Sequence, residues 1–166
     1  STLFPYTTLF RSHFLDSAQI FSILPKKVTS VIDVGTGAGF PGLVLSIMGL
    51  KNVMLVEQNK KKCVFLYEVI RETGATATVH PCKIEKLPIK DYDVVLARAF
   101  MELDGLLSVV SPFFGKDTLG VFPKGLKVNQ ELTAASKNWK MKTAIKQSIT
   151  SLDGKIVLIR DLVSER

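Results

Sequence analysis

A glycine-dense stretch, Val31–Gly42, constrains the fold of this 166-residue chain more than any other segment of the sequence. An apolar, β-branched run with the carboxylate Asp33 near its end leads through four glycines into a second apolar run, Leu43–Ile47. This order predicts a strand, a tight loop and a helix. Glycine accepts positive φ and has no Cβ, so the N–H groups of such a loop can approach a ligand closely. The N-terminus of the following helix adds unpaired N–H groups, and the stretch therefore indicates a site for a nucleotide-like small molecule.

A third apolar run, Asn52–Val56, predicts a buried strand that is followed directly by Glu57. Glu57 lies about twenty residues past the glycine cluster, the spacing at which an acidic residue accepts hydrogen bonds from ribose hydroxyls. We therefore predict that Glu57 binds a ribose.

Predicted strands and helices alternate along the rest of the chain. Further strands are predicted at residues 75–80, 91–100 and 119–125, with a closing pair at 140–149 and 155–160, and helices at 14–24, 60–73, 103–110 and 128–136. Asn59 and Gly74 are expected to cap the second of these helices, whose inner face is predicted to consist of Val64, Phe65, Leu66, Val69 and Ile70. The alternation predicts an α/β fold with a mostly parallel sheet and helices on both faces.

Two basic residues stand where predicted strands end. Arg98 lies at the carboxyl end of the fourth predicted strand and Lys124 at the tip of the fifth. Open α/β sheets bind ligands at the carboxyl ends of their strands, so Arg98 is the first candidate for a functional role and Lys124 the second. His13, at the start of the first predicted helix, is expected to be a surface or capping residue.

Composition narrows the class of partner. The chain has 22 Lys and Arg against 15 Asp and Glu, a formal net charge of +7, which favours a polyanion such as nucleic acid, although many soluble proteins are also basic. No apolar run approaches the roughly 18–20 residues of a membrane span. Cys63 and Cys82 lack a metal-binding spacing, so we expect no metal, and the absence of a disulfide framework and of a secretion signal favours the cytoplasm.

The first twelve residues fit no amphipathic pattern and look like the translation of a sequencing-adapter oligonucleotide. We expect residues 1–12 to be a non-native leader that replaces a natural segment, and residues 13–166 to form a single domain.

Three classes of function are compatible with these features. The stretch Gly37–Gly42 satisfies the G-x-G-x-x-G pattern of a nicotinamide- or flavin-dependent oxidoreductase. Against that class, the glycines start two residues earlier, Pro41 has no N–H for a pyrophosphate, and no second catalytic domain is recognisable. A non-enzymatic RNA-binding module would have no use for such a pocket. An S-adenosylmethionine-dependent methyltransferase is the remaining class.

Several motifs together resemble the bacterial 16S ribosomal RNA (guanine-N7) methyltransferase family, historically called glucose-inhibited division protein B. They are His13–Ser17, Ile32–Gly42, Asn59–Cys63 with Phe65 and Leu66, Arg98–Phe100, Lys124–Gly125 and Leu152–Gly154. The resemblance covers nearly all of residues 13–160. It implies a Rossmann-like class I methyltransferase fold, S-adenosyl-L-methionine as the cofactor, 16S rRNA or the small ribosomal subunit as the partner, and a monomeric protein.

The resemblance also implies site residues. It assigns the methyl donor to Gly35, Gly37, Gly39 and Phe40 of the loop, with Glu57 at a position where the family usually has an aspartate, and to Ile84, Glu85 and Arg98. Guanine N7 carries a lone pair and no proton, so methyl transfer to it requires no general base. Arg98 is then a candidate catalytic residue that positions donor or base, and Lys124 a second candidate that positions phosphate or base.

Overall fold

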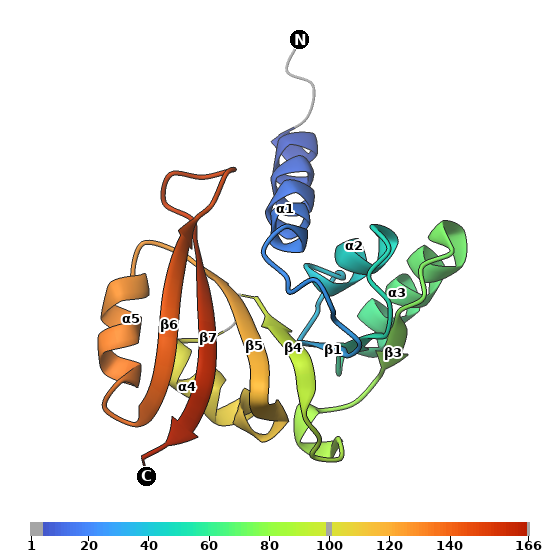
Figure 1. Ribbon diagram of the computed structural model, residues 1–166. Helices are drawn as coiled ribbons and strands as arrows, with labels where there is room; N and C mark the ends of the chain where they lie inside the picture. The colour runs from blue at the N-terminus through green and yellow to red at the C-terminus, as the bar shows by residue number, and fades with distance from the viewer. Residues whose placement is uncertain (1–4, 99–100, 166) are drawn as a thin grey trace.

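The computed structural model describes residues 5–98 and 101–165, and within them the chain forms one seven-stranded sheet of order β3-β2-β1-β4-β5-β7-β6 (Figure 1). The strands are β1 (Val31–Val34), β2 (Val53–Val56), β3 (Thr78–His80), β4 (Tyr92–Ala97), β5 (Phe114–Lys124), β6 (Trp139–Gln147) and β7 (Lys155–Ser164). Strands β1 to β5 are parallel, whereas β7 runs antiparallel to both of its neighbours. The predicted mostly parallel sheet and its closing strand pair are confirmed.

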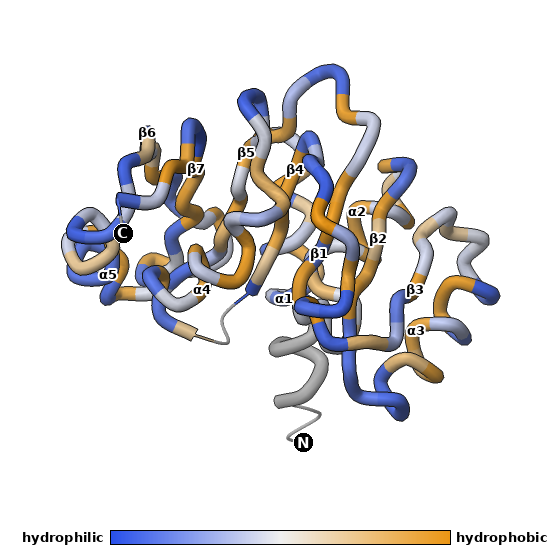
Figure 2. Tube along the Cα trace, turned by 90° about the horizontal axis from the view of Figure 1, so that it is seen from below, coloured by the Kyte–Doolittle hydropathy of each residue, from blue (hydrophilic) through white to orange (hydrophobic). Residues whose placement is uncertain are grey.

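Helices cover both faces of the sheet, as the sequence predicted (Figure 1). They are α1 (Pro5–Phe21), α2 (Gly42–Ile47), α3 (Lys60–Thr73), α4 (Leu103–Val110) and α5 (Val128–Ala135), with short 3₁₀ turns η1 (Ile84–Lys86) and η2 (Ser111–Phe113). One core cluster joins the sheet to α1, α2 and α3, and the other joins it to α4 and α5. The central strands supply apolar side chains to both clusters, and they are accordingly hydrophobic along most of their length in Figure 2.

The end residues of α3 follow the expected capping chemistry. The Asn59 side chain accepts a hydrogen bond from the Lys62 N–H (3.2 Å), and Gly74 ends the helix in the left-handed conformation with φ of 68°. Both residues satisfy backbone groups that the helix itself leaves unpaired.

The predicted inner face of α3 is partly wrong. Cys63 and Leu66 are buried, but Val64 and Phe65 are 62% and 50% exposed. A helical rotation of 100° per residue cannot bring three consecutive positions to one face, and Cys63 takes the place expected for Val64.

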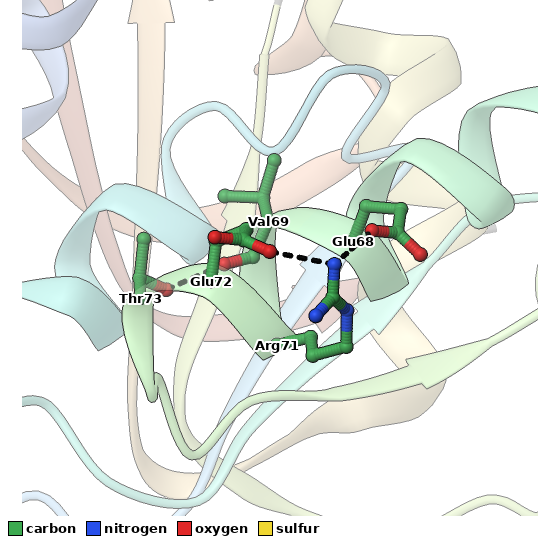
Figure 3. A network of polar contacts seen from close by, with 5 residues as sticks. All are labelled: Glu68, Val69, Arg71, Glu72 and Thr73. Atoms are coloured by element: carbon green, nitrogen blue, oxygen red, sulfur yellow. Dashed lines mark hydrogen bonds and ion pairs between the residues drawn. The ribbon is translucent and has the colours of Figure 1, made fainter.

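The outer face of α3 carries a small polar network. Arg71 forms ion pairs with Glu68 (2.9 Å) and Glu72 (2.6 Å), and the Thr73 hydroxyl donates to the Val69 carbonyl (Figure 3). All three charged side chains are more than half exposed, so these pairs contribute little to stability.

Helix α1 differs in extent from the prediction. It begins at Pro5, so the boundary expected near Ser12 lies inside the helix, and it ends at Phe21. Among residues 11–21 of this helix, for which burial is described, Ser17 and Ile20 are buried, whereas Phe14 and Phe21 are 47% and 39% exposed. His13 therefore lies within the helix rather than at its start.

Candidate functional site

The strand order changes direction between β1 and β4, which leaves the connections after these two strands at one edge of the sheet. Ligands of open α/β sheets bind at such a point, outside the carboxyl ends of the strands. The glycine loop follows β1 there, and Arg98 follows β4. Helix α1 and the loop between β6 and β7 stand at the same edge (Figure 1).

The glycine loop has the backbone geometry that its sequence predicts. Gly35, Gly37 and Gly39 have φ of 66°, 61° and 95°. A Cβ on Gly39 would lie 2.7 Å from Cβ of Leu43, and a Cβ on Gly42 would lie 2.6 Å from Oδ2 of Asp33. The loop therefore excludes side chains at Gly39 and Gly42 because protein atoms, not a ligand, fill the space.

Asp33 is a buried carboxyl group that supports this loop. Its Oδ2 accepts hydrogen bonds from the Thr36 hydroxyl (2.6 Å) and the Gly42 N–H (2.8 Å), while Oδ1 has no partner among the described residues. Burial raises the pKa of Asp33 to about 7 despite these hydrogen bonds. The sequence suggested that N–H groups at the start of helix α2 are open to a ligand. The Gly42 N–H, at the first position of this six-residue helix, instead donates to Asp33.

Glu57 is 7% exposed and ties the glycine loop to the end of β2. Its Oε2 accepts a hydrogen bond from the Gly37 N–H (3.0 Å), and its Oε1 accepts one from the Asn59 N–H (2.8 Å). Each carboxylate oxygen can accept a second hydrogen bond, so Glu57 can serve a ligand as well as the loop.

A cavity of about 390 Å³ opens beside the loop, and we call it the glycine-loop cavity. Its lining includes Gly35, Glu57, Lys83, Ile84, Glu85 and Met101. Four of the predicted donor-binding residues therefore meet at one cavity. Gly37, Gly39 and Phe40 are not part of its lining. The Gly37 N–H donates to Glu57, and the Phe40 ring lies against the rings of His13 and Phe14.

A second cavity, of about 530 Å³, lies on the other side of Met101, and we call it the Arg98–Lys124 cavity. Its charged lining residues are Asp16 of α1, Arg98 and Glu102 after β4, Lys124 at the end of β5, Lys127 after it, Glu131 of α5, and Lys155 of β7. Arg98 lines this cavity and not the glycine-loop cavity. The structure thus brings together the two predicted catalytic candidates, Arg98 and Lys124.

Lys124 is held by protein groups. Its Nζ donates to the Met101 carbonyl (2.8 Å) and to Oε2 of Glu131 (2.7 Å), and the two charged side chains are only 5% and 15% exposed. Oε2 of Glu131 also accepts a hydrogen bond from the Leu103 N–H at the start of α4 (2.8 Å). This pair, which the sequence did not suggest, joins β5, α4 and α5 at the cavity wall.

Arg98 lies in a cluster with Phe40, His13 and Phe14. Nη2 of Arg98 is 2.5 Å from Nδ1 of His13, and the guanidinium carbon is 6.0 Å from the centroid of the Phe40 ring. The His13 and Phe14 rings lie 5.7 Å and 5.1 Å from that centroid. Burial and the neighbouring Arg98 charge lower the pKa of His13. His13 is therefore not the surface or capping residue that its position in the sequence suggested.

Helix α1 is also bonded to the loop between β6 and β7. The Gln19 amide donates to the Ser148 hydroxyl (3.1 Å) and accepts from the Ile149 N–H (2.9 Å). Oδ1 of Asp16 accepts from Ser148 (3.1 Å) and from Thr150. These contacts close one wall of the Arg98–Lys124 cavity.

Two further classes of feature were sought in the described part of the chain. Residues 5–98 and 101–165 contain no group of three or more His, Cys, Asp or Glu side chains arranged to hold a metal ion. Of the helices described, none combines the length and the apolar character needed to cross a membrane.

Comparisons with known proteins agree with one another. A family model described as GidB, rRNA small subunit methyltransferase G, matches residues 5–163. Ribosomal RNA small subunit methyltransferase G of Rhodospirillum rubrum is 42% identical over 152 residues, which are 92% of this chain and 76% of that protein. The protein of the same name from Rhodospirillum centenum is 41% identical over 90% of this chain and 69% of its own length.

Solved structures share the fold at low sequence identity. Magnesium protoporphyrin IX methyltransferase from Synechocystis, solved with bound SAM, gives a TM-score of 0.69 at 13% identity over 97% of this chain and 86% of that chain. A TehB-like SAM-dependent methyltransferase from Corynebacterium glutamicum gives 0.65 at 15% identity over 93% and 95%. The predicted Rossmann-like class I methyltransferase fold is confirmed.

Proposed function

Because the chain belongs to the rRNA small subunit methyltransferase G family, we propose that it transfers a methyl group from S-adenosylmethionine to N7 of a guanine in 16S rRNA. The observation that carries this proposal is the pair of cavities at the switch point of the sheet, which share Met101. The glycine-loop cavity suits a small nucleoside-like molecule, and the Arg98–Lys124 cavity suits a larger polar one. Two reactants can therefore meet where the two cavities adjoin.

The glycine-loop cavity fits S-adenosylmethionine. Its volume of about 390 Å³ lies within the range of small-molecule sites. Gly35 exposes its backbone at the loop, Glu57 retains acceptor capacity for ribose hydroxyls, and Ile84 supplies an apolar surface for the adenine ring. Lys83 and Glu85, which flank Ile84 in the sequence, add polar groups beside that surface. When bound there, S-adenosylmethionine supplies an electrophilic methyl group on a sulfonium.

The Arg98–Lys124 cavity suits the RNA. Arg98, Lys127 and Lys155 line it, and the whole chain has a formal net charge of +7. Phosphate groups bind such surfaces with a strong dependence on salt concentration. Because Lys124 is already paired with Glu131, we assign it mainly to shaping the cavity and Arg98 to contact with the target nucleotide.

The methyl transfer requires little of the protein beyond the correct placement of the two reactants. Guanine N7 can attack the methyl group directly, and a proton need not be removed. Holding two reactants in line can lower a barrier by about 7–11 kcal/mol in favourable cases. Arg98 would orient the base through its N–H donors, because a guanidinium stays protonated and cannot act as a base.

The oxidoreductase alternative is not favoured. A dinucleotide pyrophosphate binds to free N–H groups where the glycine loop enters its helix. Here Pro41 has no N–H, and the Gly42 N–H donates to Asp33.

Calorimetric titration tests the donor assignment first. We expect S-adenosylhomocysteine to bind and NAD and NADP not to bind under the same conditions. Binding of a nicotinamide cofactor alone would overturn the proposal. Methyl transfer is then measured with radiolabelled S-adenosylmethionine on small ribosomal subunits and on free 16S rRNA, and digestion with mass spectrometry identifies the methylated base. A label found elsewhere than N7 of guanine would contradict the proposed product.

A further inference from the structure

Arg98 is held from two sides by aromatic side chains of other elements. Nη2 of its guanidinium lies 2.5 Å from Nδ1 of His13 in α1, and its guanidinium carbon lies 6.0 Å from the centre of the Phe40 ring. The His13 ring itself is tilted by 47° against Phe40 at 5.7 Å. Within residues 5–98 and 101–165, the contact with His13 is the one hydrogen bond of the Arg98 side chain.

The direction of this hydrogen bond follows from chemistry. A guanidinium has only N–H donors, so Nδ1 of His13 must be the acceptor and its ring must be neutral, with the proton on Nε2. A protonated His13 would lose the acceptor and place a second cation beside Arg98. The charged groups that face His13 are Arg98, from the end of β4, and Asp16, from its own helix.

His13 has little part in the packing of its helix. Among residues 11–21 of α1, for which burial is described, the fully covered positions are Ser17 and Ile20, which are 1% and 0% exposed, whereas His13 is only partly buried. Its contacts are with the glycine loop and with Arg98 rather than with the core of the sheet.

We propose that His13 is a positioning residue, whose neutral Nδ1 holds the Arg98 guanidinium above Phe40 so that its remaining N–H groups face the target nucleotide. This inference rests on the proposed function for the methyl-transfer part of its test. It assigns a role to helix α1, which otherwise only closes a wall of the Arg98–Lys124 cavity.

Three substitutions separate positioning from packing. In His13→Asn the amide oxygen can occupy the place of Nδ1, whereas in His13→Gln the amide lies near the place of Nε2 and in His13→Ala no acceptor remains. We expect kcat/KM for the ribosomal substrate to fall about tenfold or more in His13→Ala and His13→Gln and to recover most of this loss in His13→Asn. Affinity for S-adenosylhomocysteine should stay unchanged in all three. Equal activity of His13→Ala and the unsubstituted chain, or no advantage of His13→Asn over His13→Gln, would overturn the proposal.

A double-mutant cycle tests whether His13 acts through Arg98. In an Arg98→Ala background, His13→Ala should cause no further loss of methyl transfer, because the group that it positions is gone. Additive losses would show an independent role and contradict the proposal. Activity of the unsubstituted chain should also fall more steeply toward acid pH than that of His13→Asn.

Nuclear magnetic resonance supplies a test that needs no catalysis. The chain has two histidines, and His80→Gln identifies the His13 signals. Removing the Arg98 charge and donor should raise the pKa of His13, because both favour the neutral ring. An unchanged His13 pKa in Arg98→Ala would disprove the contact itself. If the pKa rises but no variant, including the unsubstituted chain, methylates rRNA, the proposed function fails and the contact stands.

Discussion

The glycine-loop cavity and the Arg98–Lys124 cavity lie at the same edge of one sheet, yet they are built from different parts of the chain. The first is lined by the ends of β1 and β2 and by the segment around η1, where backbone and apolar groups accompany two carboxylates, Glu57 and Glu85, and two lysines, Lys62 and Lys83. The second draws on α1, β5, α5 and the β6–β7 loop and is lined by many charged side chains.

This difference indicates how two reactants of unequal size can be handled by one fold. The small donor needs a fixed cradle, which the glycine loop provides through backbone geometry and the two hydrogen bonds of Glu57. The RNA needs an open, charged surface assembled from contacts between different elements, such as those of Arg98 with His13 of α1 and of Lys124 with Glu131 of α5. Substitutions should therefore impair donor binding and RNA methylation separately.

The largest difference between the effect on methyl transfer and the effect on donor affinity is expected for Arg98→Ala. The guanidinium lies in the Arg98–Lys124 cavity and not in the glycine-loop cavity. Methyl transfer to small subunits should fall about 100-fold, because the target base loses its orienting group, while affinity for S-adenosylhomocysteine stays within about twofold. Single-turnover rates and calorimetry on the same preparation measure the two quantities. A parallel loss of donor affinity would mean that the cavities do not act separately.

Lys124→Met tests whether Lys124 is a structural or a substrate-binding residue. Without its cation, the 15% exposed Glu131 would be left as a largely buried, unpaired charge, so we expect a loss of stability of about 3 kcal/mol in urea unfolding. The double variant Lys124→Met with Glu131→Gln should recover much of that stability. If Lys124→Met unfolds like the unsubstituted chain and only RNA methylation falls, Lys124 belongs to substrate binding after all.

Glu57→Gln probes the other cavity. The amide group replaces one of the two oxygens that accept from Gly37 and Asn59, so the loop loses a tie to β2 and the ribose loses an acceptor. Affinity for S-adenosylhomocysteine should fall about tenfold, or about 1.4 kcal/mol. Methyl transfer at saturating donor should change much less. Glu72→Gln, on the exposed face of α3 (Figure 3), is the matched control and should leave affinity unaltered.

Much of the glycine-loop side of the site could be predicted because local sequence determines it. Gly35, Gly37 and Gly39 take the positive φ that their spacing indicated, and Glu57 follows its strand beside the loop. Strand order and handedness then bring the segment with Ile84 and Glu85 to the same edge. Even here the partner of Gly42, the buried Asp33, was not predicted, although an acid within an apolar strand is a usable signal.

The Arg98–Lys124 side was predictable only in outline. Strand ends located Arg98 and Lys124, but the pairing of Lys124 with Glu131 depends on how α5 is rotated against β5. The contact of Arg98 with His13 joins residues 85 positions apart and depends on where α1 crosses the sheet edge. Neither the rotation of α5 nor the crossing position of α1 is encoded in a short motif, because both are set by tertiary packing.

The smallest effect is expected at the opposite edge of the sheet, where Asp93 lies at the start of β4. Its Oδ2 accepts from the Thr29 N–H (2.6 Å), the Thr29 hydroxyl (2.7 Å) and the Ser30 N–H (3.1 Å), and the hydrogen bonds from Thr29 hold the pKa of Asp93 below its usual value. Asp93→Ala should lower stability by about 1–2 kcal/mol at pH 7.

The lowered pKa of Asp93 determines how this loss of stability changes with pH. Because the folded pKa of Asp93 is depressed, its stabilisation is present above the unfolded pKa of about 4 and is lost as pH falls through the lower folded value. Unfolding of Asp93→Ala and the unsubstituted chain should therefore converge toward acid pH. Asp93→Ala should alter neither donor affinity nor methyl transfer well below its unfolding temperature. A loss of either activity would mean that sheet stability alone reaches both cavities, and the effects of Arg98→Ala and Glu57→Gln could then no longer be assigned to the side chains that were removed.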